Sequence, residues 1–140
     1  LDGHCDCMMH VNTYLWDDHD LGAMIAPRPL LIVSSNRDGL FSIESIRKSF
    51  ANIQSIYQLY EANDLVNLVE TPGGHSSHEH GRIKTFQFFA KHLMNKDLSY
   101  EAAKAVDSAD VPLLSEDELR VYVDGPPEDD RTTTIQETSA

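Results

Sequence analysis

A carboxylate and a histidine each follow an apolar run that has the length of a β-strand. Asp38 comes shortly after the run at 29–35, and His75 comes shortly after the run at 64–72. A carboxylate within hydrogen-bond distance of an imidazole fixes its tautomer and stabilises its protonated form. The second ring nitrogen can then take a proton from a nucleophile. Asp38 and His75 are therefore candidates for an acid–base pair.

Both residues also have a simpler interpretation as turn residues. Asp38 lies in "RDG", which is favourable turn sequence by itself. His75 lies in the histidine-rich loop "TPGGHSSHEHG" at 71–81, where two preceding glycines suit a tight and exposed presentation. The position of each residue after a predicted strand favours the catalytic interpretation.

The same loop raises the alternative of a metal site. We expect His78 and His80 to face solvent in the first turn of a following helix. The alternative is a zinc site built from histidine and cysteine side chains, namely His4, Cys5, Cys7, His75, His78 and His80. Neither H-x-x-H-x-H nor "CDC" matches a compact zinc-ligand pattern, so we predict no metal and no other cofactor.

The role of the segment His4-Cys5-Asp6-Cys7 is left open by its sequence. It either lines the same face of the fold as the predicted pair, with Tyr14 or Trp16 forming a wall of an acyl or sugar pocket, or packs as a buried insertion. In the second case each cysteine behaves as a small apolar residue. The two cysteines are too close together to suggest a disulfide, and they leave the compartment undecided.

Strands and helices that would position the pair alternate along residues 29–95. The run at 29–35 is continuously apolar and is typical of a parallel strand buried on both faces, and 64–72 is a second strand. Ser42 predicts an N-cap for the helix between them. That helix has an apolar stripe at Ile46, Phe50, Ile53, Tyr57 and Tyr60, and the helix after the histidine loop has one at Ile83, Phe86, Phe89, Ala90, Leu93 and Met94.

This alternation predicts an α/β fold with parallel strands and crossover helices. Because the carboxyl ends of parallel strands meet at one edge of a sheet, Asp38 and His75 should lie close together there. We further expect a short helix at 20–26, a packed core position for Phe41, and surface hydrogen bonds from Arg28 at the entry to the first strand. Two buried strands make a poor sheet alone, so the chain looks like part of a larger fold.

Composition and charge limit the classes of function. The chain has 140 residues, 41% of them hydrophobic, and a net charge of −12 with the acidic excess concentrated in 96–140. With no basic stripe, nucleic acid is an unexpected partner. No apolar stretch reaches membrane-spanning length, so no membrane is expected either. Residues 96–140 show little periodicity outside "LSEDELRVYV" at 114–123, and "DGPPEDDRTTT" after it indicates a linker.

Several stretches together resemble a known family. "HCDCM", "VNTYLWD", "LGAMIAPRPLLIVSSNRDGLF", "IYQLYEANDLVNLVETPGGH" and "FQFFAKHL" are similar to the carboxyl-terminal portion of acetyl-xylan-esterase-like serine hydrolases of the α/β-hydrolase superfamily. The resemblance covers roughly residues 4–94. It implies that 1–95 is the carboxyl-terminal part of the catalytic domain, that 96–140 is an acidic linker and the start of a following segment, and that Asp38 and His75 are the family's acid and histidine.

The family's triad runs serine, acid, histidine along the chain, with the serine in a G-x-S-x-G turn. No such turn occurs in the 140 residues. The resemblance therefore implies an ester hydrolase whose nucleophile lies upstream, acting on short acyl esters such as carbohydrate acetates, and a chain that is inactive alone. Its partners would be an ester substrate and the missing amino-terminal half or another subunit. The alternatives are a non-catalytic half-domain that pairs with another chain, and the metal-binding domain described above.

Overall fold

The structure, a computed structural model, describes residues 14–108 and 112–131. The chain divides into two compact units, Leu1–Ala109 and Asp110–Ala140. The described part of the second unit contains one short helix, α5 (Glu116–Leu119), which begins with a capping box between Ser115 and Glu118. The first unit holds every other helix and strand described below.

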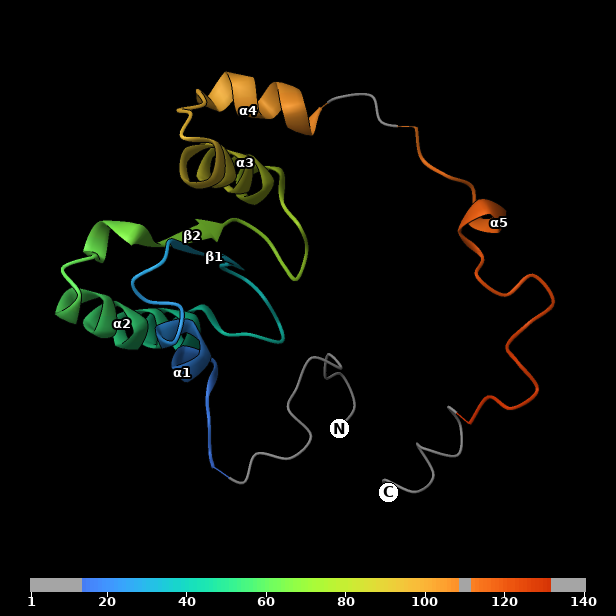
Figure 1. Cartoon of the computed structure of the whole chain (residues 1–140), viewed down its shortest axis with the longest axis horizontal. Helices are drawn as coiled ribbons and strands as arrows, with labels where there is room; N and C mark the ends of the chain where they lie inside the picture. Colours follow the sequence, from blue (N-terminus) through green and yellow to red (C-terminus); the bar gives the residue numbers. More distant parts are fainter. Residues whose placement is uncertain (1–13, 109–111, 132–140) are drawn as a thin grey trace. The chain divides into compact units, whose positions relative to one another are not determined.

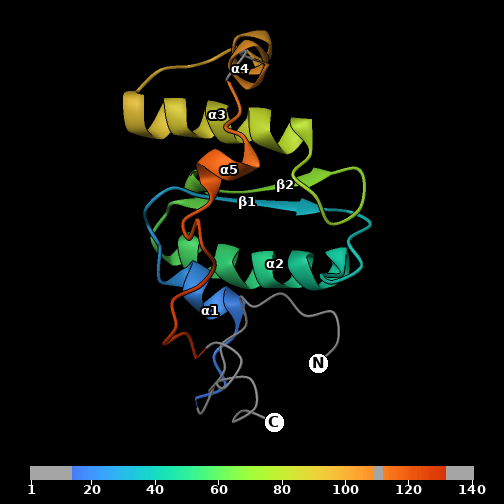
Figure 2. The same cartoon turned by 90° about the vertical axis from the view of Figure 1, so that its right-hand side faces the viewer.

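The first unit is built around a two-stranded parallel sheet. Strand β1 (Leu30–Ser35) pairs with β2 (Val66–Thr71) in a register that runs from Leu30 opposite Val66 to Ser35 opposite Thr71. Helices α1 (Asp18–Ala23) and α2 (Ile43–Leu59) lie on one face of the sheet, and α3 (Glu79–Met94) and α4 (Tyr100–Asp107) lie on the other (Figures 1 and 2). The predicted strand, helix, strand, helix order and the parallel pairing are confirmed. A sheet of this size shows an α/β arrangement and identifies no larger fold.

Helix α2 begins and packs as its sequence predicts. Ser42 is the N-cap, and its hydroxyl oxygen accepts from the backbone N–H of Ser45 at 3.2 Å. Ile53 and Tyr57 are buried against the sheet, together with Val66 of β2. The helix ends at Leu59, so Tyr60 is 58% exposed and the prediction that it extends the apolar stripe is wrong.

The first strand is less buried than its apolar sequence predicts. Residues of β1 are mostly half-buried, and Val33 is 42% exposed. A two-stranded sheet leaves one edge of each strand without a neighbouring strand, and helix α3, which approaches Val33 at Gly81, covers that side chain only in part. The prediction of a strand buried on both faces is therefore wrong for this chain.

Helix α3 buries fewer of its apolar side chains than expected. Ile83 and Ala90 are buried, and Gly81 brings the helix close to the sheet at Val33 and Thr71. Phe89 is 50% exposed and Leu93 is 77% exposed, so these two residues are not core as predicted. The side of α3 that carries them is left largely uncovered.

Helix α4 was not predicted, because its eight residues are rich in alanine and charge and have no long apolar stripe. Ser99 caps it by accepting from the backbone N–H of Ala102 at 3.1 Å. Two ion pairs join it to α3, Arg82 with Asp107 at 2.7 Å and Lys104 with Glu79 at 3.4 Å. Residues 100–107 therefore belong to the first unit, while the family assignment of 1–95 and 96–140 stays a prediction.

The chain enters β1 through α1 and a proline turn. Helix α1 starts two residues before the predicted segment, after a capping box between Asp17 and Asp20. Gly22 of α1 lies against α2, where an added Cβ would stand 2.4 Å from the Cδ1 atom of Ile53. The side chain of Arg28 donates to the carbonyl of Ile25 at 3.2 Å, which confirms the predicted surface hydrogen bond. The peptide bond between Ala26 and Pro27 is cis.

None of the helices among the described residues is both long and apolar enough to cross a membrane.

Candidate functional site

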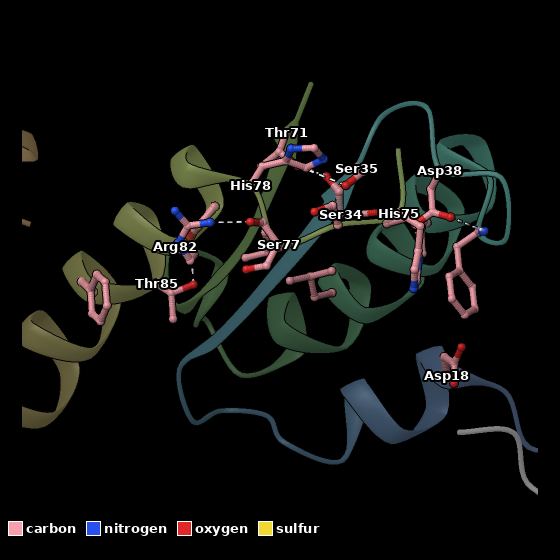
Figure 3. Close-up of a pocket in the computed structure, with 17 residues that line it drawn as sticks. Asp18, Ser34, Ser35, Asp38, Thr71, His75, Ser77, His78, Arg82 and Thr85 are labelled. Carbon is pink, nitrogen blue, oxygen red and sulfur yellow. Dashed lines mark hydrogen bonds and ion pairs between the residues drawn. The ribbon is translucent and has the colours of Figure 1, made fainter. Parts of the chain in front are cut away.

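The carboxyl ends of β1 and β2 open onto a hollow of about 740 Å³. Asp38 lies in the loop after β1, and His75 lies in the loop after β2. Both side chains line the same side of the hollow, as Figure 3 shows, while Ser77, Arg82 and Thr85 lie at its other side. The predicted placement of both residues at one edge of the sheet is therefore confirmed.

Asp38 and His75 are in direct contact. The Nδ1 atom of His75 lies 2.8 Å from the Oδ2 atom of Asp38, a short distance for a charge-assisted hydrogen bond. A carboxylate only accepts, so the His75 ring donates from Nδ1 and its Nε2 atom carries no proton in the neutral form. The Asp38 side chain is 7% exposed and the His75 side chain is 55% exposed. The acid is therefore shielded, while the imidazole faces the opening.

Two backbone amides hold the Asp38 carboxylate in place. Its Oδ1 atom accepts from the N–H of Leu40 at 2.8 Å and from the N–H of Phe41 at 3.2 Å. The amide of Leu40, with smaller contributions from the His75 side chain and the amide of Phe41, holds the pKa of Asp38 below its ordinary value of 3.8, although partial desolvation acts in the opposite direction. Asp38 is therefore ionised near neutral pH.

Phe41 is not a packed core residue as predicted, and it lines the hollow beside His75 instead. Its ring is half-buried, and its centroid lies 6.0 Å from that of the His75 ring with the planes tilted by 34°. The ring of Phe41 also lines the hollow. Phe41 therefore borders the imidazole on one side and limits the orientations that His75 can take.

Three hydrogen bonds join the loop after β1 to the last residue of β2 and to the loop that follows it. The backbone N–H of Asn36 donates to the carbonyl of Thr71 at 2.8 Å, and the N–H of Arg37 donates to the carbonyl of Gly73 at 2.9 Å. The side-chain oxygen of Asn36 accepts from the N–H of Gly73 at 3.2 Å. These bonds continue the ladder of the sheet past its last residue pair. They fix the separation of the two loops that carry Asp38 and His75.

His78 and His80 are less exposed to solvent than predicted. His78 is half-buried, and its Nε2 atom lies 2.9 Å from the carbonyl oxygen of Gly74. Gly73 has a φ of +127°, and a Cβ atom there would lie 2.4 Å from the His78 ring, so this position requires glycine. His80 is half-buried as well, with its ring centroid 6.0 Å from that of Tyr100 on α4.

Several hydroxyl groups line the hollow without contacting the imidazole. Ser35 and Thr71 are buried at its floor, with their side-chain oxygens 3.4 Å apart. Ser76 and Ser77 lie closer to His75 along the chain and also line the hollow. Within residues 14–108, no hydroxyl group forms a hydrogen bond with His75. The described residues therefore supply a carboxylate in contact with an imidazole, and none of their serines forms a hydrogen bond with that imidazole.

The remaining candidates from the sequence lie elsewhere. Tyr14 and Trp16 are 85% and 42% exposed and are not among the residues that line the hollow, although Asp18 of α1 is. No group of three histidine, cysteine, aspartate or glutamate side chains among the described residues is placed to hold a metal ion. The other members of the zinc alternative, His4, Cys5 and Cys7, lie outside the described residues, as does Asp6.

Sequence reasoning missed two residues that contact the loops of the pair. Asn36 follows a strand and precedes "RDG", so nothing distinguishes it from an ordinary turn residue. His78 follows His75 at a spacing that we interpreted as the start of an exposed helical turn. The pair of glycines before His75 was the available signal, because it indicates that some group approaches the backbone closely.

No family model, no curated protein and no solved structure matches this chain.

Proposed function

We propose that this chain is the acid- and histidine-bearing part of a serine carboxylic ester hydrolase of the α/β-hydrolase superfamily. The observation that carries the proposal is the 2.8 Å contact between His75 Nδ1 and Asp38 Oδ2 at the carboxyl ends of two parallel strands. The chain order, an acid after one strand and a histidine after the next, supports the same assignment. The resemblance to acetyl-xylan-esterase-like hydrolases suggests short acyl esters, such as carbohydrate acetates, as substrates.

The nucleophile in this proposal is a serine delivered by residues that precede this chain. The open edge of β1 offers a place for a further strand, since its backbone groups face no neighbouring strand among the described residues. The hollow runs beside that edge, where Ile32, Val33 and Ser34 line it, and reaches Asp38 and His75 at one side. A strand paired parallel to β1 would deliver its carboxyl end to the same edge as the pair.

The two residues would act on the serine as a base and its support. The serine Oγ attacks the ester carbonyl carbon while His75 Nε2 takes the hydroxyl proton, which forms a tetrahedral oxyanion. The oxyanion collapses, the C–O bond to the alcohol breaks, and Nε2 returns the proton to the departing oxygen. Water then attacks the acyl-serine by the same two proton transfers and releases the acid and the serine. Asp38 keeps the Nδ1–H tautomer and stabilises the imidazolium at each stage.

The test is turnover of p-nitrophenyl acetate by the gene product that includes the sequence encoded upstream of Leu1. Asp38→Asn should lower kcat by about 10⁴-fold, and His75→Ala should lower it by a similar factor. Asp18→Asn is the matched control, because Asp18 lines the same hollow and forms no hydrogen bond with His75. Wild-type rates in both Asp38→Asn and His75→Ala would exclude the assigned roles.

A second candidate function is a non-catalytic half-domain that pairs with another chain. The open β1 edge and the exposure of Val33 favour it, because unpaired strand edges bind other strands. Size-exclusion chromatography with light scattering on the 140-residue chain tests this candidate. It requires a dimer or larger species at micromolar concentration, and a stable monomer would count against it.

A further inference from the structure

We infer that His78 is a positioning residue for His75. The Nε2–H group of His78 donates to the carbonyl of Gly74, the residue before His75, and so holds the backbone that carries the His75 ring. The inference rests on the proposed function for its consequence in catalysis. Its structural part concerns the tautomers of His75 and His78 and can be tested without any enzyme activity.

The first observation is that His78 occupies a capping position and does not cap. It is the N-cap of α3, with φ −76° and ψ 145°, yet its side chain accepts no hydrogen bond from the first turn of that helix. Side chains at this position ordinarily accept from the second or third residue of the helix. The ring is turned back instead and lies 2.9 Å from the Gly74 carbonyl. Helix α3 therefore begins without a side-chain cap, and the His78 side chain forms its hydrogen bond with the preceding loop instead.

The second observation is the fit between the His78 ring and the glycines. A Cβ atom on Gly73 would stand 2.4 Å from Cε1 and 2.7 Å from Nε2 of His78. The ring therefore fills the space that any other residue at 73 would need. Contact with the backbone at Gly73 and a hydrogen bond to Gly74 together fix the two residues that precede His75.

The third observation is that the two ends of His75 are held by different groups. Asp38 holds the ring through Nδ1 at 2.8 Å. His78 holds the peptide group that links Gly74 to His75. If the second contact is lost, the Gly74–His75 peptide is able to rotate, and the ring meets Asp38 in a smaller fraction of molecules.

The contacts assign opposite tautomers to the two histidines. The Asp38 carboxylate accepts, so His75 carries its proton on Nδ1, and the Gly74 carbonyl accepts, so His78 carries its proton on Nε2. A histidine that faces solvent has no such fixed partner. ¹⁵N chemical shifts of the ring nitrogens distinguish the two tautomers directly.

The test uses nuclear magnetic resonance on the ¹⁵N-labelled 140-residue chain in alkaline buffer. The wild-type chain should show Nδ1–H for His75 and Nε2–H for His78. His78→Phe keeps the ring and removes the donor, so the His75 Nδ1–H signal should weaken and exchange faster with water. His78→Gln offers an amide N–H donor instead and should restore much of that signal.

His80→Phe is the matched control, because His80 lies in the first turn of the same helix and contacts Tyr100 rather than the loop. In the longer gene product, His78→Phe should lower kcat by about 10- to 100-fold with little change in KM, because a misplaced base slows proton transfer and leaves substrate affinity nearly unchanged. A His78 in the Nδ1–H tautomer, or a His75 signal that is the same in His78→Phe as in His80→Phe, would overturn the inference. If His78→Phe does not fold, the tautomers of the wild-type chain still test the inference. If the longer gene product has no esterase activity, the proposed function fails but the tautomer result is unaffected.

Discussion

At the scale of single residues, the Asp38 carboxylate is fixed on both of its oxygens. Two backbone amides hold Oδ1, and the His75 ring holds Oδ2. An acid with so many donors has little freedom to turn away from the imidazole. This arrangement suits a group that orients a base in a fixed tautomer and itself stays ionised.

The pKa of Asp38 provides a prediction with a defined sign. The carboxyl ¹³C signal of Asp38 should titrate below the ordinary value of 3.8, and in His75→Ala its midpoint should rise but stay below 3.8, because the amide of Leu40 makes the largest contribution. Because folding lowers the pKa of Asp38, its ionised carboxylate stabilises the folded chain. This stabilisation is fully present above the ordinary pKa of 3.8, and it is lost as the pH falls through the lower pKa of the folded state. A midpoint at or above 3.8 in the wild-type chain would contradict the arrangement of donors.

Gly73 provides a second prediction at the same scale. Gly73→Ala should lower the free energy of unfolding by more than about 1 kcal/mol, because alanine disfavours a positive φ and its Cβ would collide with the His78 ring. Gly39→Ala is the control, since an added Cβ there meets no atom within 4 Å. Urea unfolding followed by circular dichroism measures both variants. Equal stability of the two would show that the loop is not packed on His78.

At the scale of elements, local sequence patterns predicted where α2 begins and where the two strands lie. Ser42 starts α2, and the apolar runs become β1 and β2 within two residues of their predicted bounds. The order of these elements is enough to bring Asp38 and His75 to one edge, so this part of the site could be predicted. The contacts of Asn36 and His78 could not, because they depend on the path of two loops in space.

For α3, apolar periodicity predicted the helix correctly but not which of its side chains are buried. Phe89 and Leu93 repeat at the spacing of a buried stripe, yet both are exposed. Periodicity shows which side chains share a face, and it does not show whether anything covers that face. The ion pairs between α3 and α4 are also invisible in the sequence, since Arg82 and Asp107 are 25 residues apart.

The cap of α2 provides a prediction at the scale of elements. Ser42→Ala removes the acceptor for the N–H of Ser45 and should cost about 1 kcal/mol of unfolding free energy. Ser55→Ala on the same helix is the control. The Ser55 hydroxyl donates back to the carbonyl of Asn52 and caps nothing, so its loss should be neutral or slightly stabilising. A chemical denaturation series on both variants measures the difference, and similar values would show that the cap contributes nothing.

At the scale of the whole molecule, the first unit has a two-stranded parallel sheet with Asp38 and His75 in contact at the carboxyl ends of its strands. The loops after two parallel strands carry the pair, while the β1 edge has no neighbouring strand and Val33 and Phe89 are partly exposed in the part of the chain that the structure describes. The proposal of an upstream strand and serine explains these features together. The sequence motivates the same proposal, because Asp38 precedes His75 and no G-x-S-x-G motif occurs in the 140 residues.

The most direct measurement of the central claim is labelling by a fluorophosphonate probe, which reacts with an activated serine. The gene product that includes the upstream sequence should be labelled once, on a serine that lies before Leu1. Asp38→Asn and His75→Ala should each slow the labelling by several orders of magnitude, while Asp18→Asn should leave its rate unchanged. Labelling at the wild-type rate in the Asp38 and His75 variants would contradict the claim that these residues activate a serine.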